Sequence, residues 1–264
     1  MKRIILYLLL LNGFAVTAQL DRVEPPNWWV GFKSGNLQLL VKGKDISLYT
    51  PQLDYRGVNI KKVHKAKSPN YLLIDLEISS EAQAGTFTLE FTSKGKKKIK
   101  HDYELKSRVK PAESYVGFNS SDVVYLITPD RFANGDPSND IVEGLKESGT
   151  DRQNDYARHG GDIKGITDHI PYIKEMGFTA VWPCPLLTND MPKTSYHGYA
   201  ITDLYEIDPR FGTLEDYTEL SSKLNEQGIK LIMDQVANHC GSEHWWMKDL
   251  PFEDWINYQS RFEA

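Results

Sequence analysis

The sequence predicts an all-β sandwich followed by the first three βα units of a parallel (β/α)8 barrel, and two observations support this fold class. In the first part of the chain, short runs alternate apolar and polar residues with the period of two that β-strands require. In the second part, strand-like apolar runs alternate with amphipathic helical segments, which is typical of a parallel sheet. The pattern changes near residue 118, so we expect domains over 19–117 and 118–264, the second one truncated.

The β-domain is predicted from several short strands. The stretch GTFTLEFTS, residues 85–93, places Phe87, Leu89 and Phe91 on one face and polar residues on the other. Further strands are expected over residues 36–41, 70–78 and 99–105. Several strands at this spacing predict a β-sandwich.

Strands and helices alternate beyond residue 118. Strands are expected over 122–128, 178–182 and 229–233, and the helices between them over 167–177 and 213–228. In the first helix we expect Thr167 or Asp168 as the N-cap, Met176 on the buried face and Gly177 as the stop.

The second helix has an equally regular pattern. Thr213 is its expected N-cap, and Gly228 is its expected stop. The residues expected on its buried face are Leu214, Tyr217, Leu220 and Leu224. Strands joined by such helices are parallel, with right-handed crossovers.

Two parallel architectures fit this alternation. A nucleotide-binding doubly wound sheet requires a glycine-rich turn after the first strand, and PDRFANGDPSND, residues 129–140, contains no such turn. In a TIM barrel the functional groups stand on long loops after the strands. Here the loops after the strands, 129–162 and 183–212, are long, whereas those after the helices are short. This asymmetry favours the barrel.

Residues 1–18 have the pattern of a signal peptide. Lys2 and Arg3 precede an apolar stretch that is too short to span a bilayer, and small residues stand before Gln19. We therefore expect a soluble protein, periplasmic or secreted, without a membrane anchor. The chain has a net charge of −5, and loss of Lys2 and Arg3 would make it −7, which argues against nucleic acid as a partner.

The chain has two cysteines, Cys184 and Cys240. Export permits a disulfide between them, but both follow apolar runs, so we expect buried free thiols. The sequence leaves a homodimer open.

Polar residues follow the third barrel strand directly. IKLIMDQVANHC, residues 229–240, places Asp234, Asn238 and His239 after an apolar run. Polar groups at the mouth of a buried strand are costly to desolvate without a partner. We therefore expect a ligand, a metal or a structural hydrogen-bond network there.

The loop after the first barrel strand is rich in oxygen ligands. Asn134, Asp136, Asn139 and Asp140 offer carboxylate and amide oxygens within seven residues, as calcium requires. The spacing is not that of an EF-hand, since the terminal glutamate is absent. The alternative is a polar turn without a metal.

Four segments carry a resemblance to a known family: DQVANH (234–239), HGGDIKGI (159–166), SYHGYAITDLYEIDPRFGT (195–213) and PDRFANGDPSND (129–140). Together they resemble the α-amylase family of glycoside hydrolases, in particular its neopullulanase/cyclomaltodextrinase subgroup. The likeness covers most of residues 118–245. Residues 24–32, EPPNWWVGF, and the β-rich domain resemble the N-terminal module of Bacteroidetes-type cyclomaltodextrinases.

The resemblance implies a substrate-binding role for four residues, His197, Tyr199, Asp234 and His239. His239 would bind a sugar hydroxyl at the scissile subsite, Asp234 would hold a neighbouring arginine, and Asn238 would brace the loop. Tyr199, beside His197, would be a stacking platform. Such a set suits a carbohydrate, because its hydroxyls need convergent donors and acceptors and its ring face needs an aromatic surface.

The resemblance also implies the remainder of the metal site. The Gly160 carbonyl and the Asp162 carboxylate would join Asn134, Asp136, Asn139 and Asp140 around calcium, as in the subgroup.

The activity implied by the resemblance is retaining hydrolysis of α-1,4-glucosidic bonds in cyclomaltodextrins, pullulan or starch-derived malto-oligosaccharides, by a longer parent enzyme. Retaining glycosidases use a nucleophile and an acid about 5–5.5 Å apart, and in this family both follow the third strand. No GFRxD-type stretch occurs in the 264 residues, so none of them is assigned a catalytic role and the isolated chain is expected to be inactive. The alternative is a non-catalytic glucan-binding protein with a barrel remnant.

Overall fold

The structure is a computed structural model, and it describes residues 20–109 and 117–257. The described residues divide into two compact units, one of residues 20–109 with 251–257 and one of residues 117–250. The signal peptide predicted over residues 1–18 lies outside the described residues. In the part of the chain that is described, none of the helices combines the length and the apolar character that a bilayer crossing needs.

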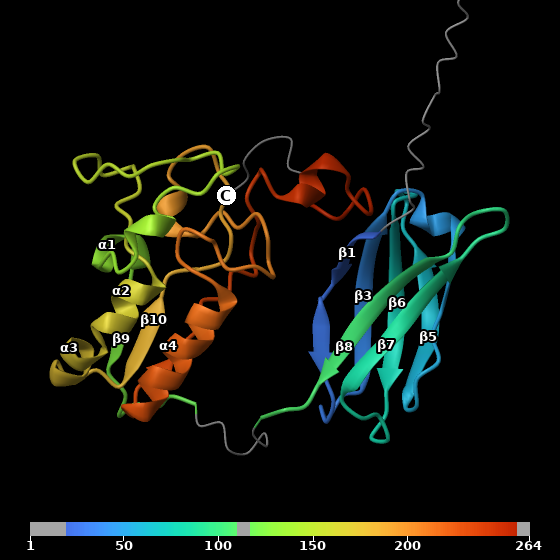
Figure 1. Cartoon of the computed structure of the whole chain (residues 1–264), viewed down its shortest axis with the longest axis horizontal. Coiled ribbons are helices and arrows are strands. Elements are labelled where there is room, and N and C mark those ends of the chain that lie inside the picture. Colours follow the sequence, from blue (N-terminus) through green and yellow to red (C-terminus); the bar gives the residue numbers. More distant parts are fainter. Residues whose placement is uncertain (1–19, 110–116, 258–264) are drawn as a thin grey trace, which may run out of the picture. The chain divides into compact units, whose positions relative to one another are not determined.

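The first unit is a sandwich of two four-stranded sheets, so the predicted all-β fold is confirmed (Figure 1). One sheet has the order β1-β3-β6-β5 and the other β2-β8-β7-β4. The strands are β1 (Leu20–Glu24), β2 (Asn27–Trp29), β3 (Asn36–Gly43), β4 (Thr50–Gln52), β5 (Val58–Lys65), β6 (Tyr71–Ile78), β7 (Gly85–Thr92) and β8 (Ile99–Lys106), with a 3-10 turn η1 at Ile46–Leu48.

One core fills the space between the two sheets. Leu39 and Val41 of β3 are fully buried in it together with Leu89 and Phe91 of β7. Alternate residues of each strand point into this core, as the period-two pattern predicts. The pairs within both sheets are antiparallel, except that β2 runs parallel to β8.

The second unit contains three parallel strands in the order β11-β10-β9 (Figure 1). The strands are β9 (Val124–Ile127), β10 (Ala180–Pro183) and β11 (Lys230–Leu231). The helices are α1 (Pro129–Phe132), α2 (Ile163–Asp168), α3 (Ile170–Glu175) and α4 (Leu214–Glu226), and the 3-10 turns are η3 (Pro137–Asn139), η4 (Ser195–His197) and η5 (Trp245–Lys248). This is the strand–helix alternation with which a (β/α)8 barrel begins, as predicted.

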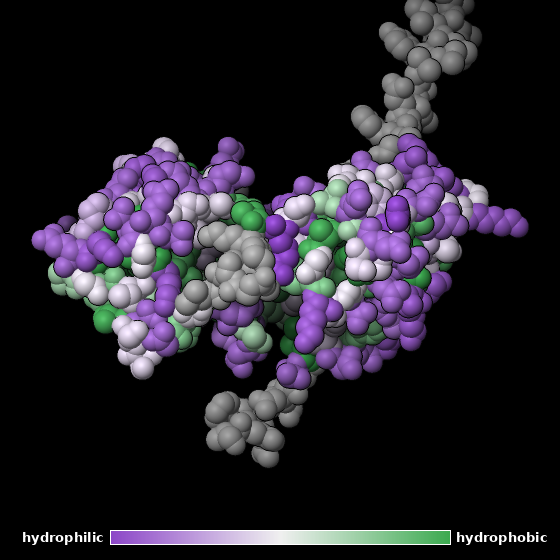
Figure 2. Space-filling model, turned by 90° about the horizontal axis from the view of Figure 1, so that it is seen from below, coloured by the Kyte–Doolittle hydropathy of each residue, from purple (hydrophilic) through white to green (hydrophobic). Residues whose placement is uncertain are grey.

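One face of this sheet packs against helices. Ile127 and Val181 lie in a buried core with Ile173 of α3 and Leu220 and Leu224 of α4. Other apolar side chains of the unit are partly exposed: Val124 at 38%, Leu126 at 56%, Trp182 at 39% and Met233 at 51%. Met233 was expected to be buried, but β11 ends at Leu231 and Met233 lies beyond the paired residues. The molecular surface seen in Figure 2 consists mainly of hydrophilic residues, with smaller hydrophobic patches among them.

The helix predicted over 167–177 begins earlier than expected. Asp162 is the N-cap of α2, because its Oδ1 accepts the Gly165 N–H at 2.6 Å. His169 then separates α2 from α3, whose first turn contains Pro171. The prediction of Thr167 or Asp168 as the cap was therefore wrong.

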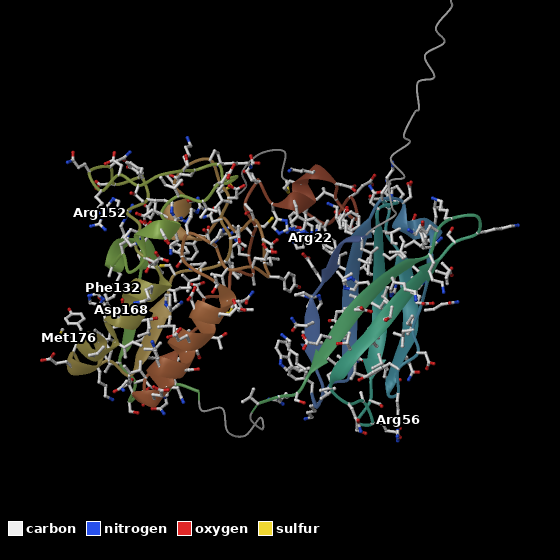
Figure 3. The ribbon with its side chains drawn as sticks, viewed as in Figure 1. Arg22, Arg56, Phe132, Arg152, Asp168 and Met176 are labelled. Carbon is white, nitrogen blue, oxygen red and sulfur yellow. The ribbon has the colours of Figure 1, made fainter. Side chains whose placement is uncertain are left out.

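Two side chains expected on buried faces lie at the surface. Met176 is 58% exposed because it follows the last residue of α3, where Figure 3 labels it. Leu214 is 57% exposed because it is the first residue of α4, one turn before the buried part of that helix. The predicted cap of α4 is present: Thr213 and Asp216 accept each other's backbone N–H groups in a capping box.

The amino-terminal ends of the three parallel strands are joined by Asp122. Its carboxylate accepts hydrogen bonds from the Lys230 ammonium at 2.7 Å and from the Thr179 hydroxyl at 2.9 Å. The Thr179 hydroxyl in turn accepts the Val123 N–H at 2.9 Å. The bond from Lys230, then those from Asn119 and Thr179, lower the pKa of Asp122 from 3.8 to about 2.

We predict that Asp122→Asn lowers stability at neutral pH and flattens its acid dependence. The folded-state pKa lies below the unfolded value, so the carboxylate stabilises the fold fully above pH 4 and loses this effect as the pH falls from about 4 to about 2. Urea unfolding from pH 7 to pH 2 would measure this, with Asp168→Asn, an exposed partner of Lys164, as the control. Equal pH profiles for Asp122→Asn and the native protein would contradict the prediction.

Candidate functional site

The predicted site residues lie on the loops that follow β10 and β11. His197 and Tyr199 are on the loop after β10, and Asp234 and His239 follow β11. Since parallel strands end at the same edge of a sheet, these loops converge at the carboxyl ends of the strands, where barrel proteins carry their functional groups. The structure joins all four residues in one hydrogen-bonded cluster.

Asp234 accepts hydrogen bonds from two aromatic side chains. The Trp182 indole N–H donates to Asp234 Oδ2 at 3.0 Å, and the Tyr199 hydroxyl donates to the same oxygen at 3.3 Å. Burial raises the pKa of Tyr199, and Cys184 and Asp234 raise it further, so Tyr199 stays a donor at neutral pH. Both of these donors are aromatic side chains, and the neighbouring arginine that the resemblance implies for Asp234 stays a prediction.

His197 is held as a neutral ring with one free donor. Its Nδ1 accepts the Tyr199 N–H at 2.9 Å, so in the neutral ring the proton lies on Nε2. Burial lowers the pKa of His197, and the nearby Glu147 carboxylate opposes this effect. The rings of His197 and Tyr199 stack at 6.0 Å between centroids and 24° between planes.

His239 links the two loops. Its Nε2 donates to the Tyr199 carbonyl at 3.1 Å, and its Nδ1 accepts from the Asn238 amide at 3.0 Å. Asn238 thus contacts the His239 ring, and the loop-bracing role that the resemblance implies for it stays a prediction. Both ring nitrogens of His239 are bonded within the protein, so binding of a sugar hydroxyl would replace its bond to Tyr199.

A small cavity lies beside Asp234. Its volume is about 10 Å³, and Cys184 and Met233 help to line it. A space of this size holds about one water molecule. Tyr199, which donates to Asp234, is 38% exposed. Both cysteines are free thiols, Cys184 buried as predicted and Cys240 only partly buried, which corrects the expectation for Cys240.

The predicted calcium ligands gather around Asp162. This carboxylate is fully buried and accepts the backbone N–H groups of Gly135 at 3.1 Å and Asp136 at 2.8 Å, besides that of Gly165. The same side chain therefore caps α2 and fastens the loop after β9 to it. Next to it, Asp140 Oδ1 accepts from the Asn134 amide at 2.9 Å.

The oxygens of this loop fit a hard cation. The side-chain oxygens of Asn134 and Asn139 are buried without a hydrogen-bond partner, which is unfavourable unless something else binds them. Burial raises the pKa of Asp140, and the Asp162 charge raises it further, an effect that a bound cation would reverse. Gly160, at φ +86°, leaves room for Asp140, because a Cβ there would lie 2.4 Å from Asp140 Oδ1.

Asp136 is oriented differently from the other predicted ligands. Its Oδ1 accepts the Ser138 N–H at 3.0 Å and the Ser138 hydroxyl at 2.6 Å, so the side chain caps η3. Among residues 20–109 and 117–257, no three His, Cys, Asp or Glu side chains are grouped to hold a metal. A cation at this loop would therefore depend on the two asparagine oxygens.

The sequence did not reveal a buried arginine beneath the loops. Arg210 Nε and Nη2 donate to the two oxygens of Asp208 at 2.9 and 2.7 Å, and both side chains are fully buried. Burial opposes ionisation of Asp208, but Arg210 and Arg158 keep its pKa below the usual value. Arg210 also donates to the carbonyls of Glu147 at 3.0 Å and Asn189 at 2.8 Å, which belong to two different loops.

Arg158 is a second buried arginine in the same region. Its guanidinium lies 4.7 Å from the Phe211 ring centroid and donates to the Ser195 hydroxyl at 3.2 Å. Its Nε lies 3.8 Å from Asp130 Oδ1, and the Asp130 carboxylate also accepts the His159 N–H at 2.9 Å. Charged residues are rarely buried unless paired. In the sequence Asp208 and Arg210 stand two residues apart, but Arg158 lies 28 residues after Asp130, and neither spacing by itself predicts burial.

Comparison with known proteins gives matches to both units. Residues 126–258 match the alpha amylase catalytic domain, and residues 22–109 match the N-terminal domain of cyclomaltodextrinase. Neopullulanase 2 of Thermoactinomyces vulgaris is 38% identical over 142 residues, which are 51% of this chain and 23% of that protein. The cyclomaltodextrinase of Thermoanaerobacter pseudethanolicus is 39% identical over 147 residues, 53% of this chain and 25% of that protein.

Among solved structures, a cyclic alpha-maltosyl-(1→6)-maltose hydrolase from Arthrobacter globiformis, in complex with maltose, is 36% identical with a TM-score of 0.41. The alignment covers 49% of this chain and 28% of that one. The chain spans a quarter or less of the two curated relatives named above.

We predict that Arg210→Met destabilises the second unit strongly. The change leaves the Asp208 carboxylate buried without its charged partner, for which a loss of about 3–5 kcal/mol is expected. Urea unfolding of the full-length protein would measure it. Lys223→Met, which removes an exposed ion pair with Glu219, is the control and should change stability little. Similar midpoints for the two variants would contradict the prediction.

Proposed function

The chain belongs to the α-amylase family of glycoside hydrolases, and from this premise we propose that its full-length parent hydrolyses α-1,4-glucosidic bonds with retention. The substrates proposed are cyclomaltodextrins, pullulan and malto-oligosaccharides from starch. We base this on one observation: His197, Tyr199, Asp234 and His239 meet in one cluster at the strand ends of a chain of this family. The names neopullulanase and cyclomaltodextrinase of two relatives support an α-glucan as the substrate.

The proposed roles follow from the contacts of each side chain. Tyr199 offers a partly exposed ring for stacking against a sugar face. His197 offers its Nε2–H to a sugar hydroxyl, since its Nδ1 is already bonded. Asp234 keeps Trp182 and Tyr199 in place, and His239 binds a hydroxyl by exchanging its bond to the Tyr199 carbonyl. Each residue therefore binds or orients the sugar.

The nucleophile and the general acid are proposed to lie outside these 264 residues. Retention requires two carboxyl groups, a nucleophile and an acid. Among the four proposed substrate-binding residues, Asp234 is the only one with a carboxylate. We accordingly propose that the isolated chain is inactive, and that the full-length protein is exported to the periplasm or beyond. If the full-length protein binds malto-oligosaccharides but releases no reducing sugar, the glucan-binding alternative holds instead.

We also propose that the parent binds calcium at the loop after β9. Asn134, Asn139, Asp140, Asp162 and the Gly160 carbonyl would hold the ion, and Asp136 would join only if its side chain left Ser138. Calcium there would supply a structural link between the loop and the start of α2, without a part in bond cleavage.

Tyr199→Ala is predicted to lower kcat/KM of the full-length enzyme for a cyclomaltodextrin about tenfold or more, because the sugar loses its stacking surface. Tyr199→Phe keeps the ring and should retain most activity. Reducing-sugar release measures both, and Tyr156→Ala, on an exposed side chain of the loop after β9, is the control. Native kcat/KM in Tyr199→Ala would refute the platform role.

Calcium is predicted to raise the melting temperature of the full-length protein. A ligand at 100 times its Kd stabilises the native state by about 2.7 kcal/mol. Asp140→Ala should abolish this effect, whereas Asp136→Ala should keep most of it, since Asp136 caps η3. Thermal unfolding with chelator and with millimolar calcium tests both, with Asp168→Ala as the control. No uptake of calcium in calorimetric titration would show that the loop is a polar turn only.

A further inference from the structure

Residues Lys146 and Glu147, on the loop after β9, are bonded to both of the other strand-end loops. The Lys146 N–H donates to Asp190 Oδ1 at 2.7 Å, and the Lys146 ammonium pairs with Glu243. The Glu147 carbonyl accepts from Arg210 at 3.0 Å. This two-residue segment therefore fixes its own loop to the loop after β10 and to the residues that follow β11.

The Glu147 carboxylate binds two consecutive backbone groups of the loop after β10. Its Oε1 accepts the Thr194 N–H at 3.1 Å, and its Oε2 accepts the Ser195 N–H at 2.6 Å. Thr194 has φ +57°, a conformation that residues other than glycine rarely adopt. Such a conformation persists only where the surroundings enforce it, and here the carboxylate supplies two of those contacts.

Ser195 is held on its other sides as well. Its hydroxyl accepts from the buried Arg158, and its carbonyl accepts from the Asn189 amide at 3.1 Å. The side chain is fully buried. The turn that starts here carries His197 two residues later and Tyr199 four residues later, so a shift of Ser195 moves both.

We propose that Glu147 is a positioning residue that fixes the turn over residues 194–199 and so aims His197 and Tyr199 at the sugar. Glu147 acts through the Thr194 and Ser195 N–H groups. The kinetic consequence rests on the proposed function, whereas the conformational one concerns this turn alone. The negative charge of Glu147 also acts on the imidazole of His197, against the larger effect of burial on its pKa.

The test uses the full-length protein with Glu147→Ala, Glu147→Gln and the control Glu143→Ala, which removes an exposed carboxylate from the same loop. Displacement of the turn should lower kcat for a cyclomaltodextrin about tenfold in Glu147→Ala, with KM changed less than about threefold. Glu147→Gln keeps one acceptor oxygen for the two N–H groups, so its kcat should lie between those of Glu147→Ala and the native enzyme.

The ¹⁵N shifts of the His197 ring give a readout that does not need activity. The native ring should show a protonated Nε2 and an acceptor Nδ1, and Glu147→Ala should show a mixture of tautomers as the Tyr199 N–H moves away. His197→Gln assigns the signals. If the native protein cleaves no α-glucan, the proposed function fails while this measurement still decides the role of Glu147.

An unchanged His197 tautomer in Glu147→Ala overturns the proposal, even if the melting temperature falls, because Glu147 would then be merely structural. If Glu147→Ala does not fold, Glu147→Gln decides: native ¹⁵N shifts in that variant overturn the proposal, and a partial shift supports it.

Discussion

Two arginines buried beneath the strand-end loops, Arg158 and Arg210, provide the interactions on which the arrangement of the site depends. Long loops have few backbone hydrogen bonds of their own, so their conformations are set by side chains that bind several carbonyls at once. Arg210 does this by joining Asp208 to the carbonyls of Glu147 and Asn189. Movement of one loop away from its arginine would leave a buried guanidinium without its partner, which is strongly unfavourable.

The cluster of His197, Tyr199, Asp234 and His239 is consequently formed by segments far apart in the sequence. His239 reaches the Tyr199 carbonyl, and Trp182 and Tyr199 share one oxygen of Asp234. Each contact joins the loop after β10, or β10 itself, to the residues after β11. Asp162 likewise joins two segments, since its carboxylate both caps α2 and binds the loop after β9. Substitution of any one of these side chains would therefore remove contacts from two segments of the chain.

The sequence predicted elements whose signal is periodic or local. Alternation located β7, and the Thr213 cap located α4, because both are determined by residues close in the chain. The predicted start of the helix at Thr167 failed because Asp162, assigned to a metal, also serves as a cap. Periodicity placed Met176, just after the end of α3, and Leu214, the first residue of α4, on buried faces, but both side chains are more than half exposed.

The sequence indicated which residues lie together at the strand ends, but it did not indicate their contacts. The motifs located His197, Tyr199 and Asp234, yet neither the bond from Trp182 nor the orientation of Asp136 toward Ser138 follows from spacing. Burial of Arg210 could not be predicted either, because it depends on three-dimensional pairing.

Asp122 and Tyr199 belong to opposite ends of the same three strands. The carboxylate of Asp122 joins the beginnings of the strands through Lys230 and Thr179, while Tyr199 and Asp234 meet where the strands end. The hydrogen bonds that align the beginnings of the strands and those that join the strand-end loops thus belong to different side chains. Over evolutionary time, substitutions in the strand-end loops would leave the hydrogen bonds of Asp122 that align the strands intact. The two ends of this sheet can therefore vary independently of each other.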